Sequence, residues 1–192
     1  MKAALTGGIG CGKSTALRAF RNHDCATVSA DALGHEILSE SSSAAFVVAR
    51  FGAECAPAGT VDRERLARVV FADPAARKEL EDFIHPKIEA AWRERVRAAE
   101  ERGEDCVVEI PLLFEKNLEG AFDRTVCLVC SEAVQLERLE KRGLPRERAL
   151  ARIAAQLPIE EKARRADVCL FNDGSPEFLE KQIAIFAKNF LN

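Results

Sequence analysis

The sequence predicts a three-layer α/β/α fold with a five-stranded parallel sheet at its centre. Three observations predict it: five short apolar segments, helical segments between them, and a glycine-rich loop directly after the first apolar segment. With 192 residues, the chain is long enough for a domain with a substantial core. Hydrophobic residues make up 47% of it and charged residues 31%, a composition typical of globular proteins.

The apolar segments are the predicted strands. They cover residues 2–6, 25–29, 106–110, 125–130 and 167–171. Most of them lack strict alternation with polar residues, which indicates strands buried on both faces, as in a parallel sheet. The C-x-x-C pair Cys127 and Cys130 falls in the fourth segment, where it is better explained as two small core residues than as a metal or redox site.

More than seventy residues separate the second and third strands, too many for a simple crossover. They are predicted to be almost entirely helical, with helices over 31–40, 43–51, 62–71, 74–84 and 87–102. Pro86 predicts a helix end near His85 and a new helix start at Pro86. We expect this insertion at the carboxyl edge of the sheet, where ligands of open α/β sheets bind.

A second helical stretch, residues 131–165, lies between the fourth and fifth strands and is dense in arginine. A final helix is predicted over 176–190. Together these segments predict three parts of the chain. They are a nucleotide-binding core (1–30, 104–130 and 166–192), a helical substrate subdomain (31–103) and an arginine-rich lid (131–165).

The glycine-rich loop, Gly7–Ser14, reads GGIGCGKS and matches the phosphate-binding pattern G-x-x-x-x-G-K-[ST]. Its glycines let the backbone curl so that successive N–H groups face phosphate oxygens. Lys13 supplies a charge for the terminal phosphates, and Ser14 offers a hydroxyl to Mg²⁺. The nucleotide-binding residues predicted here are Gly8, Gly10, Cys11, Gly12, Lys13, Ser14 and Thr15. The loop leaves the acceptor of the terminal phosphate open.

Two acidic residues follow or end predicted strands. Asp31 comes just after the second strand, where a carboxylate could accept a hydroxyl proton, although an N-cap role for the next helix is equally compatible. Glu109 lies late in the third strand, where an acid is costly unless it is paired or near a metal. Glu109 is therefore a candidate partner of Mg²⁺, with a surface-edge glutamate as the alternative.

Arg138 and Arg142 lie four residues apart and share one face of a predicted helix. Acidic neighbours make a solvated salt-bridge surface a serious alternative. Because the cluster lies in an insertion between strands of a nucleotide-binding sheet, we expect a mobile lid that brings arginines to the phosphates.

A formal net charge of −3 provides no broad basic field, so we expect neither nucleic acid nor a membrane surface as a partner. No segment approaches the ~18 consecutive apolar residues of a membrane helix. Seven cysteines, scattered and odd in number, suit reduced thiols. With no leader segment visible at the N-terminus, these features predict a cytoplasmic protein.

Several short motifs follow one another along nearly the whole chain. They are LTGGIGCGKST (5–15), SAD (29–31), VDRERL (61–66), VF (70–71), HP (85–86), PLLFE (111–115), QLERLEKR (135–142), RIAAQ (152–156), AD (166–167) and NDG (172–174). In this order they resemble dephospho-CoA kinases. The phosphate loop is common to many kinases, whereas HP and PLLFE together with the GGIG form of the loop are more discriminating.

The resemblance implies a P-loop NTPase-type kinase that transfers the ATP γ-phosphate to the 3′-hydroxyl of the dephospho-CoA ribose, with Mg²⁺. It implies that Asp31 faces the acceptor hydroxyl and that Arg138 contacts the transferring phosphate. The implied ATP-side residues beyond the loop are Arg142, Asn172 and Gly174. The implied substrate-side residues are His85, Pro86, Leu112, Leu113 and Phe114, together with Asp31.

Two positions depart from the family pattern. Ser29 stands where the family often has an acid, which leaves Asp31 as the stronger acidic candidate. Cys11 stands where a serine is usual, but the backbone N–H matters more at that position than the side chain. Two other readings stay open: a P-loop kinase of another nucleoside, nucleotide or shikimate-like metabolite, and a nucleotide-hydrolysing regulatory switch.

Overall fold

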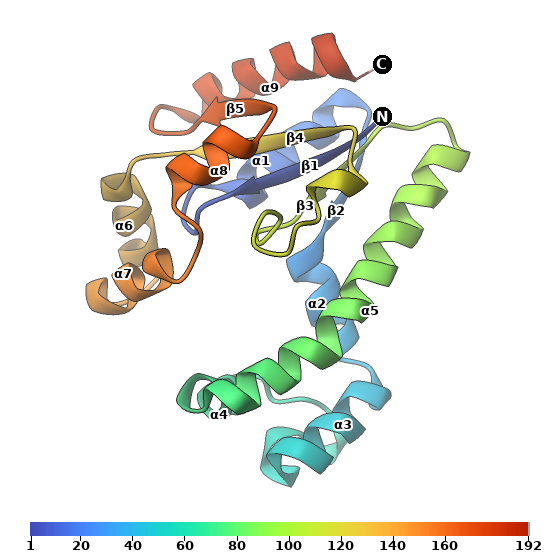
Figure 1. Ribbon diagram of the computed structural model, residues 1–192, viewed down its shortest axis with the longest axis vertical. Helices are drawn as coiled ribbons and strands as arrows, with labels where there is room; N and C mark the ends of the chain where they lie inside the picture. The colour runs from blue at the N-terminus through green and yellow to red at the C-terminus, as the bar shows by residue number, and fades with distance from the viewer. Residues whose placement is uncertain (192) are drawn as a thin grey trace. The chain divides into compact units, whose positions relative to one another are not determined.

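The centre of the computed structural model, which describes residues 1–191, is a five-stranded parallel sheet (Figure 1). Its strands are β1 (Lys2–Gly7), β2 (Ala26–Ser29), β3 (Cys106–Glu109), β4 (Arg124–Val129) and β5 (Val168–Phe171). Each neighbouring pair is parallel, and the strand order is β2-β3-β1-β4-β5. The predicted fold class and all five predicted strands are confirmed.

The central position of β1 explains why its residues do not alternate between apolar and polar. Ala3, Ala4 and Leu5 are fully buried, because β3 and β4 flank the strand and helices cover both faces of the sheet. Strand β3 is likewise buried along its whole length. Cys127 and Cys130 are buried too, as expected for small core residues.

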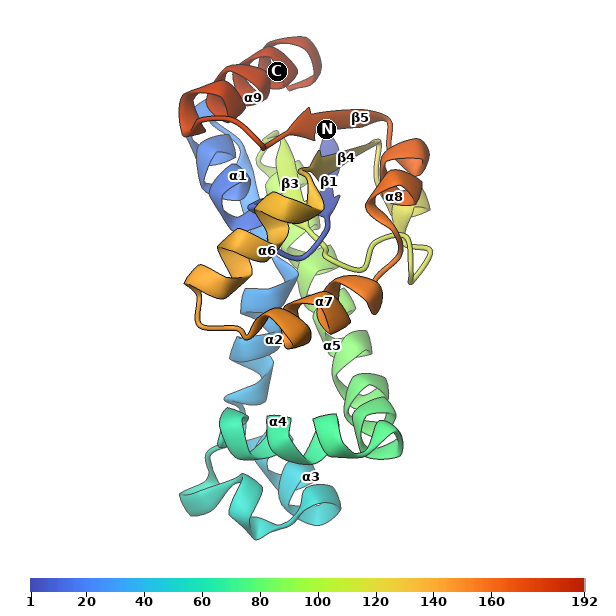
Figure 2. The ribbon, with the colours of Figure 1, turned by 90° about the vertical axis from the view of Figure 1, so that its left-hand side faces the viewer.

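The helices of the described residues are α1 (Lys13–Phe20), α2 (Ala30–Leu38), α3 (Ser41–Phe51), α4 (Arg63–Ala72), α5 (Pro74–Glu101), α6 (Glu132–Lys141), α7 (Arg146–Ala154), α8 (Ile159–Arg165) and α9 (Pro176–Phe190). Helices α1 and α8 lie on opposite sides of the sheet (Figure 2). Helix α9 packs on α1, where the rings of Phe20 and Phe186 meet edge to face with centroids 5.8 Å apart.

The predicted helix boundary at His85 and Pro86 is wrong, because α5 runs through both residues without interruption. Proline removes only one N–H donor from the helical ladder, and the hydrogen bonds on either side maintain the helix. Asp73 accepts a hydrogen bond from the N–H of Ala75 at 2.8 Å and so stabilises the start of this helix.

The chain divides into two compact units. Unit 1 contains Met1–Ser29 and the described residues from Arg95 onward, and therefore the whole sheet and helices α6 to α8. Unit 2 is the uninterrupted segment Ala30–Glu94. It has its own apolar core, in which Val47, Leu66 and Val70 are among the buried residues. The division between the units falls inside α5 rather than in a loop.

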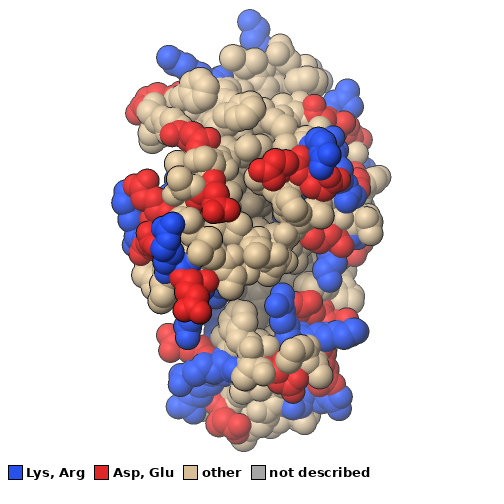
Figure 3. All heavy atoms as spheres, turned by 60° about the vertical axis from the view of Figure 1, so that its left-hand side comes forward, with Lys and Arg blue, Asp and Glu red and all other residues tan. Residues whose placement is uncertain are grey.

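The surface carries charges of both signs. On the face drawn in Figure 3, lysine and arginine side chains are interspersed with aspartate and glutamate, in keeping with the small net charge. Among residues 1–191, no helix combines the length and apolar character needed to cross a membrane.

Candidate active site

The candidate site of unit 1 lies at the carboxyl edge of the sheet. Because all five strands are parallel, the segments that follow β1, β3, β4 and β5 leave the sheet at the same edge. The phosphate loop follows β1, the PLLFE segment follows β3, and Asn172 follows β5. Residues widely separated in sequence therefore meet here.

Two glycines give the phosphate loop its shape. Gly10 and Gly12 have φ angles of 82° and 92°, which residues other than glycine rarely adopt. A β-carbon on Gly12 would stand 2.4 Å from Nδ2 of Asn172, and one on Gly10 would stand 3.0 Å from the carbonyl oxygen of Gln135. The loop is thus both curled and closely packed, as a cradle for phosphate requires.

Lys13 folds back over the loop. Its Nζ donates hydrogen bonds to the carbonyl oxygens of Gly7 and Gly8, both at 3.1 Å. Ser14 and Thr15 follow it in the first turn of α1, and both are exposed. The N-terminal end of α1 adds a positive partial charge beside these side chains, which favours an anion there.

Arg138 of α6 contacts the loop directly. Its Nη1 donates to the carbonyl oxygens of Gly10 and Cys11, both at 3.4 Å, and its Nη2 donates to that of Asn172 at 2.8 Å. The side-chain amide of Asn172 donates to the same Cys11 carbonyl at 2.7 Å. Arg138 and Asn172 are therefore brought together at the loop, and the guanidinium does not belong to the exposed ion pairs of its helix.

The other two predicted ATP-side residues are more peripheral. Arg142 caps the C-terminal end of α6 and is exposed. Gly174 is exposed in the segment between β5 and α9. Arg146 pairs with Glu140 at 3.5 Å on the exposed surface, so the salt-bridge alternative holds for this arginine.

Glu109 is only 3% exposed, which excludes the alternative of a surface-edge glutamate. Its carboxylate accepts a hydrogen bond from the hydroxyl of Ser29 at 3.0 Å, across the β2–β3 register that pairs the two residues. An acidic residue at position 29 would put a second carboxylate next to Glu109. Ser29 instead donates a hydrogen bond from an uncharged hydroxyl. The Ser29 hydroxyl and the Glu109 carboxylate are hard oxygen donors at the same edge of the sheet as Ser14, and donors of this kind suit Mg²⁺ better than a soft metal.

The PLLFE segment continues from β3 in a series of turns. Leu113 and Phe114 are 0% and 1% exposed, and the guanidinium of Arg165 lies 4.7 Å from the centre of the Phe114 ring. Leu112 is only half-buried. Leu113 and Phe114 therefore shape the segment from within, which leaves Leu112 as the more accessible of the three.

The remaining predicted substrate residues belong to unit 2. Asp31 is exposed in the first turn of α2, inside the helix rather than at its N-cap. His85 is half-buried and Pro86 is exposed, both in the middle of α5. An acid in the first turn interacts favourably with the helix dipole, and its exposure leaves the carboxylate accessible to a ligand.

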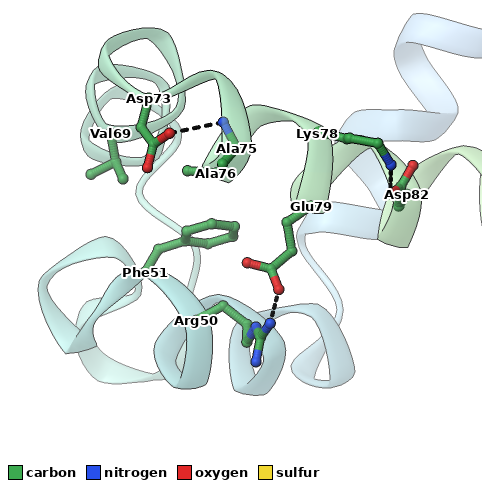
Figure 4. Close-up of a pocket in the computed structure, with 9 residues that line it drawn as sticks. All are labelled: Arg50, Phe51, Val69, Asp73, Ala75, Ala76, Lys78, Glu79 and Asp82. Atoms are coloured by element: carbon green, nitrogen blue, oxygen red, sulfur yellow. Dashed lines mark hydrogen bonds and ion pairs between the residues drawn. The ribbon is translucent and has the colours of Figure 1, made fainter.

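Unit 2 also contains a cavity of about 800 Å³ between α3, α4 and the start of α5 (Figure 4). Its charged side chains pair with one another: Arg50 with Glu79, and Lys78 with Asp82 at 2.5 Å. Phe51 projects into it. None of the nine residues that line it is a predicted substrate residue.

Cys11 lies next to Cys130, with the two sulfur atoms 3.3 Å apart. The Cys130 thiol donates to the Cys11 sulfur, and this hydrogen bond, aided by the Lys13 charge and opposed by burial, lowers the pKa of Cys11 to about 7. The same contact raises the pKa of Cys130. The side chain of Cys11 is thus turned into the core, while its backbone remains part of the loop.

Sequence reasoning assigned no role to three side chains that contact the phosphate loop or the PLLFE segment. The backbone N–H of Ile9 donates to Oε1 of Gln156 at 2.8 Å. Lys162 is fully buried and pairs with Glu115 at 2.8 Å. Gln135 is buried against Gly8 and Gly10. Gln156 is the last residue of the RIAAQ motif and Gln135 is the first of QLERLEKR, so these motifs were the available signal for the two glutamines. Lys162 lies in none of the motifs.

Comparison with known proteins identifies the family. The family model for dephospho-CoA kinase matches residues 1–177. A dephospho-CoA kinase of Anaeromyxobacter dehalogenans is 43% identical over 179 residues, which cover 91% of this chain and 85% of the relative.

Solved structures agree. A crystal structure from Thermus thermophilus has a TM-score of 0.84 and 34% identity, covering 100% of this chain and 98% of its own. A dephospho-CoA kinase structure from Campylobacter jejuni has a TM-score of 0.69 and 28% identity, and the match covers 98% of this chain and 96% of the other. With a matching family model along almost its entire length and close relatives of similar size, the chain belongs to the dephospho-CoA kinase family.

Proposed function

We propose that this chain transfers the γ-phosphate of ATP to the 3′-hydroxyl of the dephospho-CoA ribose, giving coenzyme A and ADP. The observation that carries the proposal is a curled phosphate loop, with Gly10 and Gly12 at positive φ, in a chain that matches the family over residues 1–177. The loop supplies the donor side of the reaction, and the family supplies the identity of the acceptor.

On the donor side, backbone N–H groups from Gly10 to Thr15 bind the phosphates of ATP. Lys13 moves from its carbonyl partners to the terminal phosphates and offsets the charge that spreads over the transferring group. Arg138 adds a second charge from α6 and stabilises the same group, while Asn172 and Gly174 border the nucleotide.

On the acceptor side, Asp31 accepts a hydrogen bond from the ribose hydroxyl and orients it for in-line attack. In unit 2, His85 and Pro86 also contact dephospho-CoA. In unit 1, Leu112 contacts it, and Leu113 and Phe114 support Leu112 from the core. The exposure of Asp31 is compatible with this role.

The donor set also fits Mg²⁺. The Ser14 hydroxyl would hold the ion directly, and Glu109 would hold it through water. When bound, Mg²⁺ neutralises charge on the β- and γ-phosphates.

Helices α6 and α7, in the segment 131–165, act as a lid. Closure of the lid over ATP excludes water, which favours transfer to the acceptor over hydrolysis. Both substrates are soluble metabolites, and we place the enzyme in the cytoplasm.

The decisive experiment is ADP release measured with ATP and Mg²⁺, with and without dephospho-CoA, alongside a panel of nucleosides, nucleotides and shikimate. We expect rapid release that requires dephospho-CoA. Stimulation by a different acceptor would replace the substrate assignment, and slow release unaffected by any acceptor would favour a regulatory switch.

A further inference from the structure

The segment that follows lid helix α7 connects two loops of the candidate site. We name residues 156–162 the anchor segment. It begins where the last turn of α7 ends, because the N–H of Gln156 donates to the carbonyl oxygen of Ile153 at 3.1 Å. It ends within α8, at Lys162. A displacement of α7 that is transmitted along the chain toward α8 therefore enters the anchor segment at Gln156.

The first contact of the anchor segment is with the phosphate loop. Oε1 of Gln156 accepts the backbone N–H of Ile9 at 2.8 Å. Ile9 stands inside the GGIGCGKS loop, directly before Gly10. This side chain thus holds one backbone N–H of the phosphate loop, and it sets the orientation of the Gly8–Ile9 peptide, directly before Gly10.

The second contact is with both ends of the PLLFE segment. Nζ of Lys162 donates to the carbonyl oxygen of Pro111 at 2.9 Å and pairs with Oε1 of Glu115 at 2.8 Å. The N–H of Leu157 donates to the same carboxylate oxygen at 3.0 Å. The hydroxyl of Thr6, on β1, also donates to the Pro111 carbonyl, at 3.3 Å. The anchor segment therefore fixes where the PLLFE segment starts and where it ends.

The burial of these charges argues against a purely stabilising role. The Lys162 side chain is 0% exposed, and the second carboxylate oxygen of Glu115 is buried with no hydrogen-bond partner among the described residues. A well-packed apolar pair would fill such a site at lower cost in desolvation. An ion pair fixes the direction of its partners, which apolar packing does not.

We propose that Gln156 and the Glu115–Lys162 pair are positioning residues for phosphoryl transfer, which hold the phosphate loop and the PLLFE segment in one fixed relation to the base of the lid. Gln156 aligns the donor loop, and the ion pair aligns the segment assigned to the acceptor side. The inference rests on the proposed function, because it concerns the alignment of donor and acceptor in that reaction.

The first test replaces Gln156 with Met, which keeps the length of the side chain and removes the acceptor oxygen. Misalignment lowers kcat by about tenfold to a hundredfold, while the dissociation constant of ATP stays near the wild-type value. Gln182→Met is the matched control. The side-chain amide of Gln182 also forms hydrogen bonds with backbone groups, but these belong to Phe171 in the edge strand β5. An unchanged kcat in Gln156→Met overturns the role of Gln156.

The second test separates positioning from stability. Lys162→Met lowers both kcat and the melting temperature, whereas the double variant Glu115→Leu/Lys162→Met recovers the melting temperature and keeps the low kcat. Recovery of kcat together with the melting temperature overturns the role of the pair. Arg164→Met is the control, because Arg164 belongs to the same helix and pairs with Glu161 in an exposed position.

A readout without an acceptor distinguishes failure of this inference from failure of the proposed function. Amide hydrogen exchange of the peptide containing Ile9 is measured with ADP bound. We expect faster exchange in Gln156→Met than in the wild type and in Gln182→Met. Equal exchange in all three overturns the inference, whether or not dephospho-CoA proves to be the acceptor.

Discussion

Lys13 is the residue whose charge the donor side depends on most. Its ammonium group is held by two loop carbonyls and lies where the terminal phosphates of a bound nucleotide would attract it. We predict that Lys13→Ala lowers kcat by about 10²–10³-fold, the usual cost of removing one group that stabilises transition-state charge. A steady-state assay of ADP release checks this. Lys188→Ala, an exposed lysine on α9, serves as the control, and full activity in Lys13→Ala would contradict the assignment of the phosphate loop.

Asp31 gives a different expectation, because it belongs to the acceptor side. Asp31→Asn keeps the shape of the side chain but cannot accept a proton, so kcat should fall by about 10²–10⁴-fold. The KM for ATP should change little. Glu36→Gln, an exposed acid on the same helix, is the control. A near-normal kcat in Asp31→Asn would remove this residue from the mechanism.

Cys11 tests whether the loop works through its backbone. Its thiol points to Cys130 and not toward a ligand, so Cys11→Ser should leave kcat and the KM for ATP close to the wild-type values. Gly12→Ala is the contrasting variant. Alanine is strained at a φ of 92°, and its β-carbon would lie 2.4 Å from Nδ2 of Asn172. We expect Gly12→Ala to abolish ATP binding in a titration. Equal effects of the two substitutions would refute the distinction.

The sequence identified the loop residues because each position of GGIGCGKS has its own chemical reason. It could not assign Gln156 or Lys162 in the same way. Their roles depend on partners 147 and 51 residues away, Ile9 and Pro111, that only the tertiary fold brings within hydrogen-bond distance. Similarly, whether Glu109 is buried depends on β2 and β1 packing on either side of β3.

At the scale of elements, α5 shows where local rules are overridden. A proline normally ends a helix, yet α5 continues through Pro86, because the turns on both sides supply enough hydrogen bonds and packing. The strands were predicted correctly because burial on both faces leaves a recognisable apolar run. No comparable pattern in the sequence indicates that a helix continues past a proline.

Replacing Pro86 with alanine should therefore stabilise the protein and impair substrate binding. Removing the clash of the proline ring with the preceding turn and restoring the missing N–H together gain about 3 kcal/mol. The greater freedom of the unfolded chain takes back about 1 kcal/mol, which leaves about 2 kcal/mol. Urea denaturation measures this gain. If Pro86 contributes to the acceptor surface, the KM for dephospho-CoA rises in the same variant. Lower stability would mean that α5 relies on the proline ring for packing.

At the scale of the whole molecule, buried thiols make stability depend on alkaline pH. Burial raises the pKa of Cys25 to about 11 and that of Cys106 and Cys127 to about 12. In the unfolded chain these thiols lose their protons near the ordinary pKa of 9.0. Above that pH the native state binds more protons than the unfolded state, so stability falls as pH rises.

We predict a decline in the free energy of unfolding between about pH 9 and pH 11, with a slope of up to about 1.4 kcal/mol per pH unit for each thiol. Urea titrations across this range check it. Cys106→Ala should lower stability at neutral pH and make the alkaline decline less steep. A decline of the same steepness in that variant would exclude Cys106 as a contributor.

The position of unit 2 in the chain has a consequence for synthesis on the ribosome. Within residues 1–191, β2 pairs only with β3, and β1 pairs only with β3 and β4. Both early strands must therefore wait until residues beyond 106 have emerged. Unit 2, by contrast, is one continuous stretch with a core of its own, complete once residue 94 has left the exit tunnel. The segment translated between β2 and β3 is thus the first able to fold, and β1 with its phosphate loop stays unpaired until β3 and β4 have emerged.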